Sequence, residues 1–315
     1  MFYFCGKNLS GPPVKFTDDE LLELTQPDGG RFRTGDDRGA FAFCRRLSLG
    51  HYENFPVGSA LIPAALRPHF FSVYAFSRIA DDVGDELGHL GAGAQLDALD
   101  RLEKLLEDSG NAGNPVFAAL GATRKKFGIP TLPFRRLLEA FRRDVNFSQP
   151  ETFAALLGYC AYSANPVGEI VLRLAGAFNP VAAPLSDAVC SALQLVNFWQ
   201  DISRDFARNR MYIPKNYVGT ARYDKDYLHS SEFYPKFLTA LPRLLAETDE
   251  MFARGRGLLK HLPYKRLQWE IAATIGGGRR IVRKVEHLGA QILTTRPALG
   301  AADAVLIAFS VLTKR

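Results

Sequence analysis

The chain is poor in cysteine, and its cysteines follow no pattern that would pair them or bind a metal. Four cysteines are spread over 315 residues, without a CxxC pair or zinc-finger spacing. The sequence therefore predicts neither a disulfide framework nor a zinc site. Reduced thiols of this kind usually pack as small apolar groups, which favours a cytoplasmic protein.

Long apolar runs are also missing. No window reaches the ~18 apolar residues of a membrane-spanning helix, and the first residues, MFYFCGKNLSGPP, lack the pattern of a signal peptide. The segment 298–312 (ALGAADAVLIAFSVL) is apolar enough to lie on a membrane surface, but its length and Asp303 favour a packed terminal helix. We expect a cytoplasmic protein, with peripheral contact at the inner face of the membrane as a further option for an apolar product.

A nucleic-acid partner is not indicated, although the formal net charge is +6. Lys and Arg are dispersed, and no recognised nucleic-acid-binding motif is present. The positive charge then points to an anionic substrate or an anionic membrane surface. Glu-x-x-His pairs do not occur in the number and place that a helical di-iron protein needs, so that class is disfavoured as well.

Strand patterns are absent, and helical patterns fill the chain. From Arg38 onward, apolar-periodic segments alternate with breaks rich in Pro and Gly, and no stretch shows the alternation of a strand. We therefore expect an all-α protein with an N-terminal extension over 1–37, which contains one short helix at 17–25, and a single domain over 38–315. The breaks are expected at 107–116, 128–133, 146–151, 178–184 and 276–278.

Against this background, one acidic spacing occurs twice. Asp81 and Asp85 in DDVGDE, with Asp82 between them, and Asp201 and Asp205 in DISRD each place two carboxylates on one helix face. Two like charges at this spacing repel by roughly a few tenths of a kcal/mol, so a cation should offset them. Either copy alone is commonly a solvated helix face.

A hard divalent cation can offset both charges of such a pair. Mg²⁺ takes oxygen ligands and is typically held by one or two carboxylates together with the phosphate oxygens of a substrate. Two acidic helix faces turned toward each other would therefore form a site that ionises a diphosphate. We expect Arg78, near the first pair, and Arg210, near the second, to contact the phosphates.

The residues around both pairs suit an amphipathic substrate. Aromatic residues precede Arg78 in FSVYAFSRIADDVGDE (71–86). In QLVNFWQDISRDFARNRMYIP (194–214), Gln194 and Asn197 extend the second pair into a polar stripe on an otherwise apolar helix. The tyrosine-rich segment 207–235 is either a lid over the site or a plain surface connection.

Together these motifs resemble the squalene/phytoene synthase family. The resemblance covers roughly residues 40–290 and includes HYENFPVGSALIPAALRP (51–68), YCAYSANPVGEIVLRLAG (159–176) and both aspartate segments. More narrowly, ENFPV, SANPVG and FWQD resemble the forms found in the hydroxysqualene synthases of bacterial hopanoid biosynthesis. Other members more often carry Arg where Gln200 stands, and a small Gly or Ala run where Asn165 and Pro166 stand.

The resemblance implies the all-helical isoprenoid synthase fold, a single-domain bundle around a central apolar cavity, and an enzyme that acts on a prenyl diphosphate with Mg²⁺. The narrower resemblance implies conversion of presqualene diphosphate to hydroxysqualene, in which water quenches the rearranged carbocation and NADPH is not needed. The implied metal ligands are Asp81, Asp82, Asp85, Asn197, Asp201 and Asp205, of which Asp81, Asp85, Asp201 and Asp205 are also catalytic. The implied substrate-binding residues are His51, Tyr52, Phe55, Arg78, Gln194, Asn197, Gln200, Arg210 and Tyr212.

Tyr159 and Asn165 are two further candidates for catalysis. Tyr159 is a candidate wall for the carbocation, because an aromatic face stabilises a nearby cation, and core packing is the alternative. The other candidates for this wall are Tyr52, Phe55 and Phe76. Pro166 interrupts a helix and frees a backbone carbonyl one turn back. We expect Asn165 and that carbonyl to hold the quenching water, whereas the alternative is a kink that only fits the bundle.

Two rival functions are left open. The first is head-to-head condensation of two farnesyl or geranylgeranyl diphosphates to presqualene diphosphate, dehydrosqualene or phytoene, against which Gln200 and SANPVG argue. The second is a non-enzymatic assembly factor of the same fold, which the two intact aspartate pairs disfavour.

Overall fold

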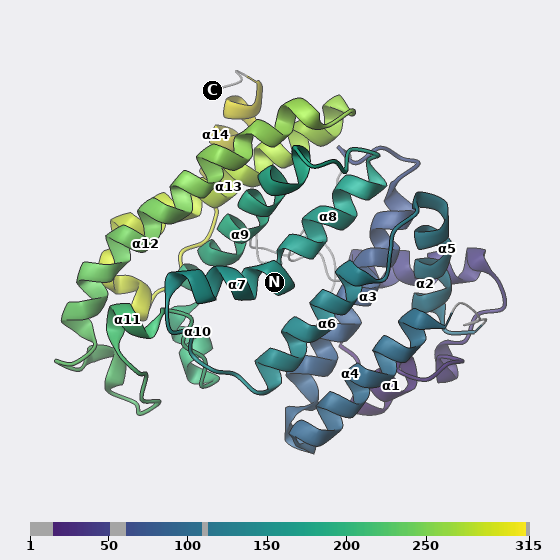
Figure 1. The fold of residues 1–315 in the computed structure, drawn as a ribbon, viewed down its shortest axis with the longest axis horizontal. Helices are drawn as coiled ribbons and strands as arrows, with labels where there is room; N and C mark the ends of the chain where they lie inside the picture. Colours follow the sequence, from purple (N-terminus) through teal and green to yellow (C-terminus); the bar gives the residue numbers. More distant parts are fainter. Residues whose placement is uncertain (1–14, 51–60, 109–112, 313–315) are drawn as a thin grey trace. The chain divides into compact units, whose positions relative to one another are not determined.

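The computed structural model of the chain describes residues 15–50, 61–108 and 113–312. Within these ranges every regular element is a helix, which confirms the all-α prediction (Figure 1). None of the described helices is long and apolar enough to cross a membrane. Contacts between Cα atoms divide the chain into two compact units. The expected division into an extension over 1–37 and a single domain over 38–315 stays a prediction.

The N-terminal unit contains the described residues 15–146 and 169–178. Its central helix is α3 (Arg67–Glu86), which packs against the five other α-helices of the unit. Most of α3 is buried, because its apolar residues recur around the whole helix and not along one stripe. The other elements are α1 (Asp18–Leu24), η1 (Gly30–Phe32), α2 (Asp37–Gly50), η2 (Leu87–Leu90), α4 (Ala92–Glu107), α5 (Pro115–Phe127) and α6 (Leu132–Val145).

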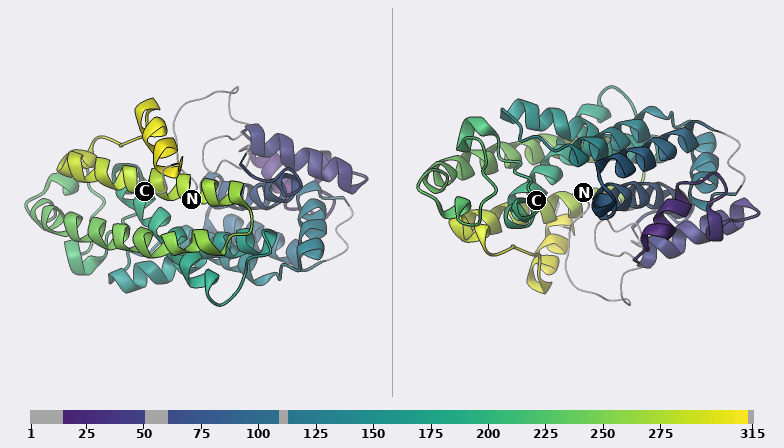
Figure 2. Two further views of the ribbon diagram at one scale, coloured as in Figure 1. Left: turned by 90° about the horizontal axis from the view of Figure 1, so that it is seen from above. Right: turned by 90° about the horizontal axis from the view of Figure 1, so that it is seen from below.

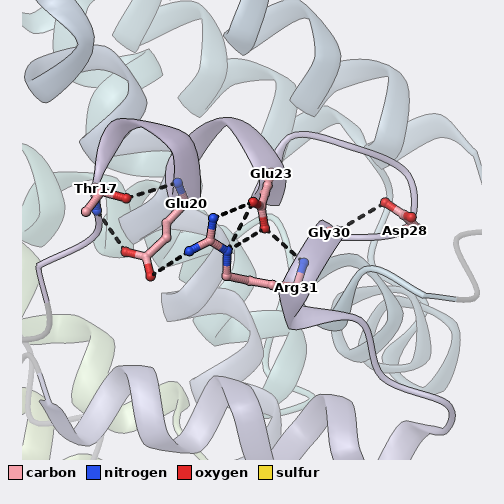
Figure 3. A network of polar contacts seen from close by, with 6 residues as sticks. All are labelled: Thr17, Glu20, Glu23, Asp28, Gly30 and Arg31. Atoms are coloured by element: carbon pink, nitrogen blue, oxygen red, sulfur yellow. Dashed lines mark hydrogen bonds and ion pairs between the residues drawn. The ribbon is translucent and has the colours of Figure 1, made fainter.

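Polar contacts fix the start of the described chain (Figure 3). The Glu20 amide donates to the Thr17 side chain and the Thr17 amide donates to the Glu20 carboxylate, a capping box that begins α1. Arg31 in η1 pairs with Glu23 in α1, with 2.7 Å between Nη2 and Oε1. The predicted short helix is therefore confirmed, and an ion pair ties it to the turn that follows.

The C-terminal unit contains the described residues 147–168 and 179–312. Its core is formed by α9 (Ala182–Gln200), α12 (Tyr234–Gly255) and α13 (Lys265–Leu288), which pack against one another (Figure 1). Trp199 Nε1 donates to Thr248 Oγ1 at 2.9 Å and so joins α9 to α12 inside this core. The other elements are α7 (Phe153–Ser163), α8 (Asn165–Leu174, whose last residues belong to the N-terminal unit), α10 (Ile202–Ala207), α11 (Lys215–Val218), η3 (Tyr227–His229), η4 (Arg256–His261), η5 (Gly289–Leu293) and α14 (Ala301–Leu312).

Four of the five predicted breaks coincide with helix ends, but the break predicted at 276–278 is wrong. α13 runs through these three glycines without interruption. The physical reason is packing against α12: a Cβ added to Gly278 would lie 3.0 and 3.1 Å from Cε1 and Cε2 of Phe252, and closer still to its Cζ. Glycine costs helix propensity, but here it lets a phenyl ring approach the α13 backbone and become buried.

Gly278→Ala is expected to lower the free energy of unfolding by about 1–3 kcal/mol, because the added methyl group overpacks against Phe252. Gly121→Ala in α5 is the matched control, since no atom lies within 4 Å of its added Cβ. Helix propensity should raise the stability of that control by up to about 1 kcal/mol. Urea unfolding measures both variants, and equal effects would contradict the packing explanation.

Candidate active site

The first aspartate pair lies in the last turns of α3, in the N-terminal unit. Asp82 is only 6% exposed and faces Arg78: Nη2 lies 2.6 Å from Oδ1, and Nε donates to Oδ2 at 3.1 Å. Arg78 is farther from Asp81, with 3.9 Å between Nη1 and Oδ2. Burial raises the pKa of Asp82 to about 7, against the attraction of Arg78. The structure thus gives Asp82 a bidentate partner, while Asp81 and Asp85 lie on the less buried side of the helix.

The second aspartate pair lies at the junction of α9 and α10, in the C-terminal unit. The sequence predicts one continuous helix, but Asp201 has φ −107° and ψ 17° and separates the two helices. Backbone hydrogen bonds still cross the junction: the Asp201 amide donates to Asn197 O, and the Asp205 amide donates to Asp201 O, both at 2.9 Å. Asp201 and Asp205 therefore stay on successive turns in spite of the break.

A tight turn after α10 returns Arg210 to Asp205. Asn209 is the only non-glycine residue in the described ranges with positive φ, at 58°. The Arg210 amide donates to Asp205 O at 2.9 Å and the Asn209 amide to Phe206 O at 3.0 Å, which is the Schellman pattern. The expected neighbour of the second pair is thus placed by local backbone geometry.

The carboxyl group of Asp205 has an unusually high pKa. Burial is the main cause that raises its pKa to about 7, and the nearby Asp201 adds to the rise, whereas Arg210 opposes it. Such a carboxyl gains more from a bound cation than an exposed one does, because the cation restores the charge that burial disfavours.

Arg296 supplies Asp201 with a cationic partner that the sequence did not reveal. Nε donates to Oδ1 at 2.5 Å and Nη2 donates to Oδ2 at 3.0 Å, a bidentate ion pair between residues 95 positions apart. Pro297, which follows Arg296, is held as well, because Gln200 Nε2 donates to its carbonyl oxygen at 2.5 Å. No periodicity or motif around Arg296 points to α9, so only the tertiary structure could find this contact.

Two side-chain oxygens of α9 are buried and accept no hydrogen bond within the described part of the chain: Gln194 Oε1 and Gln200 Oε1. Gln194 is 6% exposed and Gln200 is 3% exposed. Buried acceptors of this kind are rare in folded proteins, and each one calls for a donor or a cation. They belong to the polar stripe that the sequence predicts for this helix, together with the buried Asn197.

Tyr159 and Tyr212, both predicted for the site, meet in one aromatic cluster of the C-terminal unit. Tyr212 stacks on Phe198, with ring centroids 3.9 Å apart and ring planes at 14°. Tyr159 lies 5.7 Å from Tyr212 and 6.0 Å from Phe198, and Phe147 lies 5.0 Å from Tyr212. The cluster shares α9 with the second aspartate pair, since Phe198 comes three residues before Asp201.

Among the described residues, the other predicted wall residue, Phe76, is not part of this cluster. Phe76 is 1% exposed and packs edge-on against Phe117 and Phe134, which favours the core alternative for it. His51, Tyr52 and Phe55 lie outside the described residues.

Asn165 begins α8 after a one-residue break from α7, as Pro166 predicts. Its Oδ1 accepts a hydrogen bond from Ser191 Oγ of α9 at 2.8 Å. The two helices approach closely at Gly168, where an added Cβ would lie 2.7 Å from Cys190 Sγ. Because Ser191 holds the oxygen of the Asn165 amide, the amide nitrogen is directed away from that serine.

The donor set fits a hard divalent cation such as Mg²⁺. Each aspartate pair offers carboxylate oxygens, and buried amide oxygens accompany the second pair. Among the residues that the structure describes, no three His, Cys, Asp or Glu side chains converge on one point. One or two carboxylates per ion, completed by water and phosphate oxygens, is the usual arrangement for Mg²⁺, so the set present here is sufficient.

Comparison with known proteins points to one family. The model of the squalene/phytoene synthase family matches residues 49–303. The chain is 34% identical to the hydroxysqualene synthase of Zymomonas mobilis over 232 residues, which are 71% of this chain and 75% of that protein. It is 32% identical to the hydroxysqualene synthase of Rhodopseudomonas palustris over 235 residues, 74% of this chain and 80% of that protein.

Solved structures of related synthases share the fold. The squalene synthase HpnC of Alicyclobacillus acidocaldarius matches with a TM-score of 0.72 and 38% identity, over 80% of this chain and 95% of that one. A dehydrosqualene synthase solved in complex with a ligand matches with a TM-score of 0.75 over 88% of this chain and 97% of that one; at 22% identity, this likeness concerns the fold alone. The predicted isoprenoid synthase fold is therefore confirmed.

Proposed function

The chain belongs to the squalene/phytoene synthase family of enzymes, and on this premise we propose that it converts presqualene diphosphate to hydroxysqualene with Mg²⁺, a reaction of squalene and hopanoid biosynthesis. The observation that carries the proposal is the second aspartate pair, where a half-buried Asp205 with a pKa of about 7 stands next to Asp201 and two arginines. Similarity to two hydroxysqualene synthases supports the choice of reaction.

Loss of the diphosphate requires positive charge where negative charge develops. Mg²⁺ held by the aspartates would supply this charge as a Lewis acid. Arg210, which the turn at Asn209 holds beside Asp205, is placed to bind a phosphate oxygen close to the same carboxylate. Gln194 and Asn197 offer neutral oxygens on the same stripe of α9.

The first aspartate pair is proposed to bind metal in the same way. Asp81 and Asp85 have the same spacing and lie on the less buried side of α3. Asp82 is engaged by Arg78, and this ion pair fixes the arginine at the edge of the acidic segment. Arg78 can then meet a phosphate with its remaining N–H groups, since a guanidinium carries five donors.

The carbocation that remains needs walls that stabilise it without reacting. Tyr159, Phe198 and Tyr212 form a contiguous aromatic surface in the C-terminal unit. An aromatic face close to a cation contributes on the order of 0.5–2 kcal/mol. This cluster is the part of the described chain that best suits the role.

Water must reach the carbocation at a defined position, and Asn165 is proposed to hold it. Ser191 fixes the orientation of the Asn165 amide, so that the amide N–H₂ is the group left to donate to a water oxygen. A water molecule that accepts one hydrogen bond keeps its second lone pair available for attack on the carbocation. One oriented amide donates a single hydrogen bond of this kind.

Asn165→Ala is expected to shift the product from hydroxysqualene toward hydrocarbons that form by proton loss, because the quenching water loses its partner. Ser191→Ala keeps the amide but releases its orientation, and is expected to shift the product in the same direction by a smaller amount. Ser186→Ala, at another buried serine of α9, is the control. Mass spectrometry of the extracted products gives the ratio; an unchanged ratio and rate in Asn165→Ala would remove the residue from the mechanism.

Head-to-head condensation of two prenyl diphosphates is the second candidate, because the matching family contains synthases of both kinds. Parallel incubations of the purified protein with presqualene diphosphate and with farnesyl diphosphate, with Mg²⁺ and without NADPH, distinguish the two. We expect hydroxysqualene from presqualene diphosphate, no turnover once Mg²⁺ is chelated, and no product from farnesyl diphosphate alone. A product from farnesyl diphosphate alone would assign condensation instead.

A further inference from the structure

α14 exposes its apolar side chains and buries its only charge. Val305 and Phe309 are 69% and 63% exposed, the highest values of any large apolar side chain in the described ranges, and Leu306 is 50% exposed. Asp303, the sole charged residue of the helix, is 3% exposed. A packed surface helix shows the opposite pattern. The packed terminal helix predicted from the sequence is therefore present, and its packed side consists of Asp303 with the half-buried Ile307 and Val311.

Asp303 fastens α14 to α13. Arg280 Nε lies 2.6 Å from Oδ1 and Lys284 Nζ lies 2.5 Å from Oδ2, while the Gly300 amide donates to Oδ2 at 2.8 Å. The Gly300 amide and the two cations hold the pKa of Asp303 well below its usual range. α14 lies on the side of α13 that is turned away from α12 (Figure 2). The ion pairs of Asp303 and the half-buried Ile307 and Val311 lie on one side of the helix, whereas Val305, Leu306 and Phe309 are exposed.

Basic residues surround this apolar helix in the sequence. Residues 279–315 contain seven Lys and Arg and two Asp and Glu. Arg279 and Arg296 are paired with Asp249 and Asp201, which lie outside the segment, so the segment with these two partners carries a net charge of +3, half of the +6 of the whole chain. Arg283 on α13 is exposed, and Lys314 and Arg315 follow α14 in the sequence.

We propose that α14 is an interfacial helix that docks the protein on an anionic phospholipid bilayer. With 12 residues, α14 is about 18 Å long, too short for the ~30 Å hydrocarbon layer, so it would lie in the plane of the surface. Val305, Leu306 and Phe309 would enter the acyl boundary, and the surrounding Lys and Arg would meet the lipid phosphates.

Charge and shape indicate that the exposed side of α14 binds a lipid bilayer and not a groove on another protein. A groove typically takes one stripe of a helix, whereas the described side chains of α14 are exposed on nearly every side, including its small Ala residues. Each basic residue near an anionic surface adds about 1 kcal/mol of attraction, so a net charge of +3 beside exposed apolar side chains favours such a surface. The prenyl chains that the family processes are themselves membrane-soluble, but the inference stands on the α14 surface and not on the reaction.

Vesicle flotation with the full-length protein tests the proposal. Vesicles of phosphatidylcholine with about one third phosphatidylglycerol are compared with vesicles of phosphatidylcholine alone. The variant Val305→Ser/Leu306→Ser/Phe309→Ser removes the apolar face. The matched control is Leu90→Ser/Leu132→Ser/Leu238→Ser, whose three leucines are 45%, 50% and 44% exposed on other helices.

The wild type and the control are expected to float with the anionic vesicles and to dissociate as salt is raised. The α14 variant is expected to bind at least about tenfold more weakly, because three partly exposed apolar side chains no longer enter the bilayer. Turnover in detergent should be the same in all three proteins, so this readout is independent of the reaction. Failure of the wild type to float, or equal binding by the α14 variant, would overturn the proposal. A wild-type dimer that the α14 variant breaks in sedimentation would overturn it as well, by assigning the face to a second copy of the chain.

Discussion

Asp205→Asn is expected to lower kcat/KM by about a thousandfold or more and, at the same time, to stabilise the metal-free protein near pH 8. The loss of activity follows from the loss of a carboxylate that we propose to bind Mg²⁺ beside the leaving diphosphate. The gain in stability follows from burial, which makes the charged form of Asp205 unfavourable in the folded protein. One substitution thus measures both the contribution of this carboxylate to catalysis and its cost to the stability of the folded protein.

The raised pKa of Asp205 determines how the free energy of unfolding changes with pH. In the unfolded chain an aspartate ionises near pH 3.9, whereas in the folded protein the pKa of Asp205 is about 7. The folded state therefore holds a proton that the unfolded state releases, and the wild type loses stability relative to Asp205→Asn as the pH rises from about 4 to about 7. In the presence of a chelator we expect no difference near pH 4, and a difference of about 1–2 kcal/mol near pH 8.

Urea unfolding at both pH values, together with steady-state kinetics, checks these expectations. Asp226→Asn, at an exposed aspartate in the segment after α11, is the control and should change neither quantity. If Asp205→Asn kept most of the activity, the metal-binding role of the second pair would have to be abandoned. If it destabilised the metal-free protein near pH 8, the described burial of Asp205 would be contradicted.

Arg296→Gln is expected to destabilise the metal-free protein by about 2 kcal/mol and to increase its stabilisation by Mg²⁺. The destabilisation arises because Asp201 loses a bidentate partner and is left beside the carboxyl of Asp205. The stronger response to Mg²⁺ arises because a cation that binds Asp201 no longer has to displace the guanidinium. Thermal unfolding with increasing Mg²⁺ concentration, in the absence of substrate, measures both effects.

Arg279→Gln is the matched control for this prediction. Arg279 forms a comparable bidentate pair with Asp249, at 2.6 and 2.8 Å, but this pair joins α13 to α12 and does not involve Asp201 or Asp205. This control should lower stability without changing the response to Mg²⁺. A weaker Mg²⁺ response in Arg296→Gln than in the wild type would show that Arg296 supports cation binding and does not compete with it.

The sequence predicts those parts of the protein that depend on local spacing. Apolar periodicity predicts the helices, and the i,i+4 aspartates are recognisable because that spacing always places two side chains on one helix face. Pro166 predicts the break between α7 and α8 for a similarly local reason, since proline cannot donate the backbone bond that a helix needs.

Contacts between distant segments could not be predicted in this way. Arg296 meets Asp201 only because the chain after α13 returns to the end of α9, and no property of residue 296 encodes that return. The glycines at 276–278 predict a break when read locally, but Phe252 from another helix packs against them and the helix continues. For the same reason the sequence could count Asp303 as polar but could not show that it would be the most buried of the described side chains of α14.

Turnover of presqualene diphosphate in water labelled with heavy oxygen, with Mg²⁺ and without NADPH, tests the central claim most directly. The proposed mechanism requires hydroxysqualene whose hydroxyl oxygen comes from the labelled water, and requires no reductant. Hydroxysqualene without the label, or a hydrocarbon as the main product of the wild type, would contradict the proposal that bound water ends the reaction.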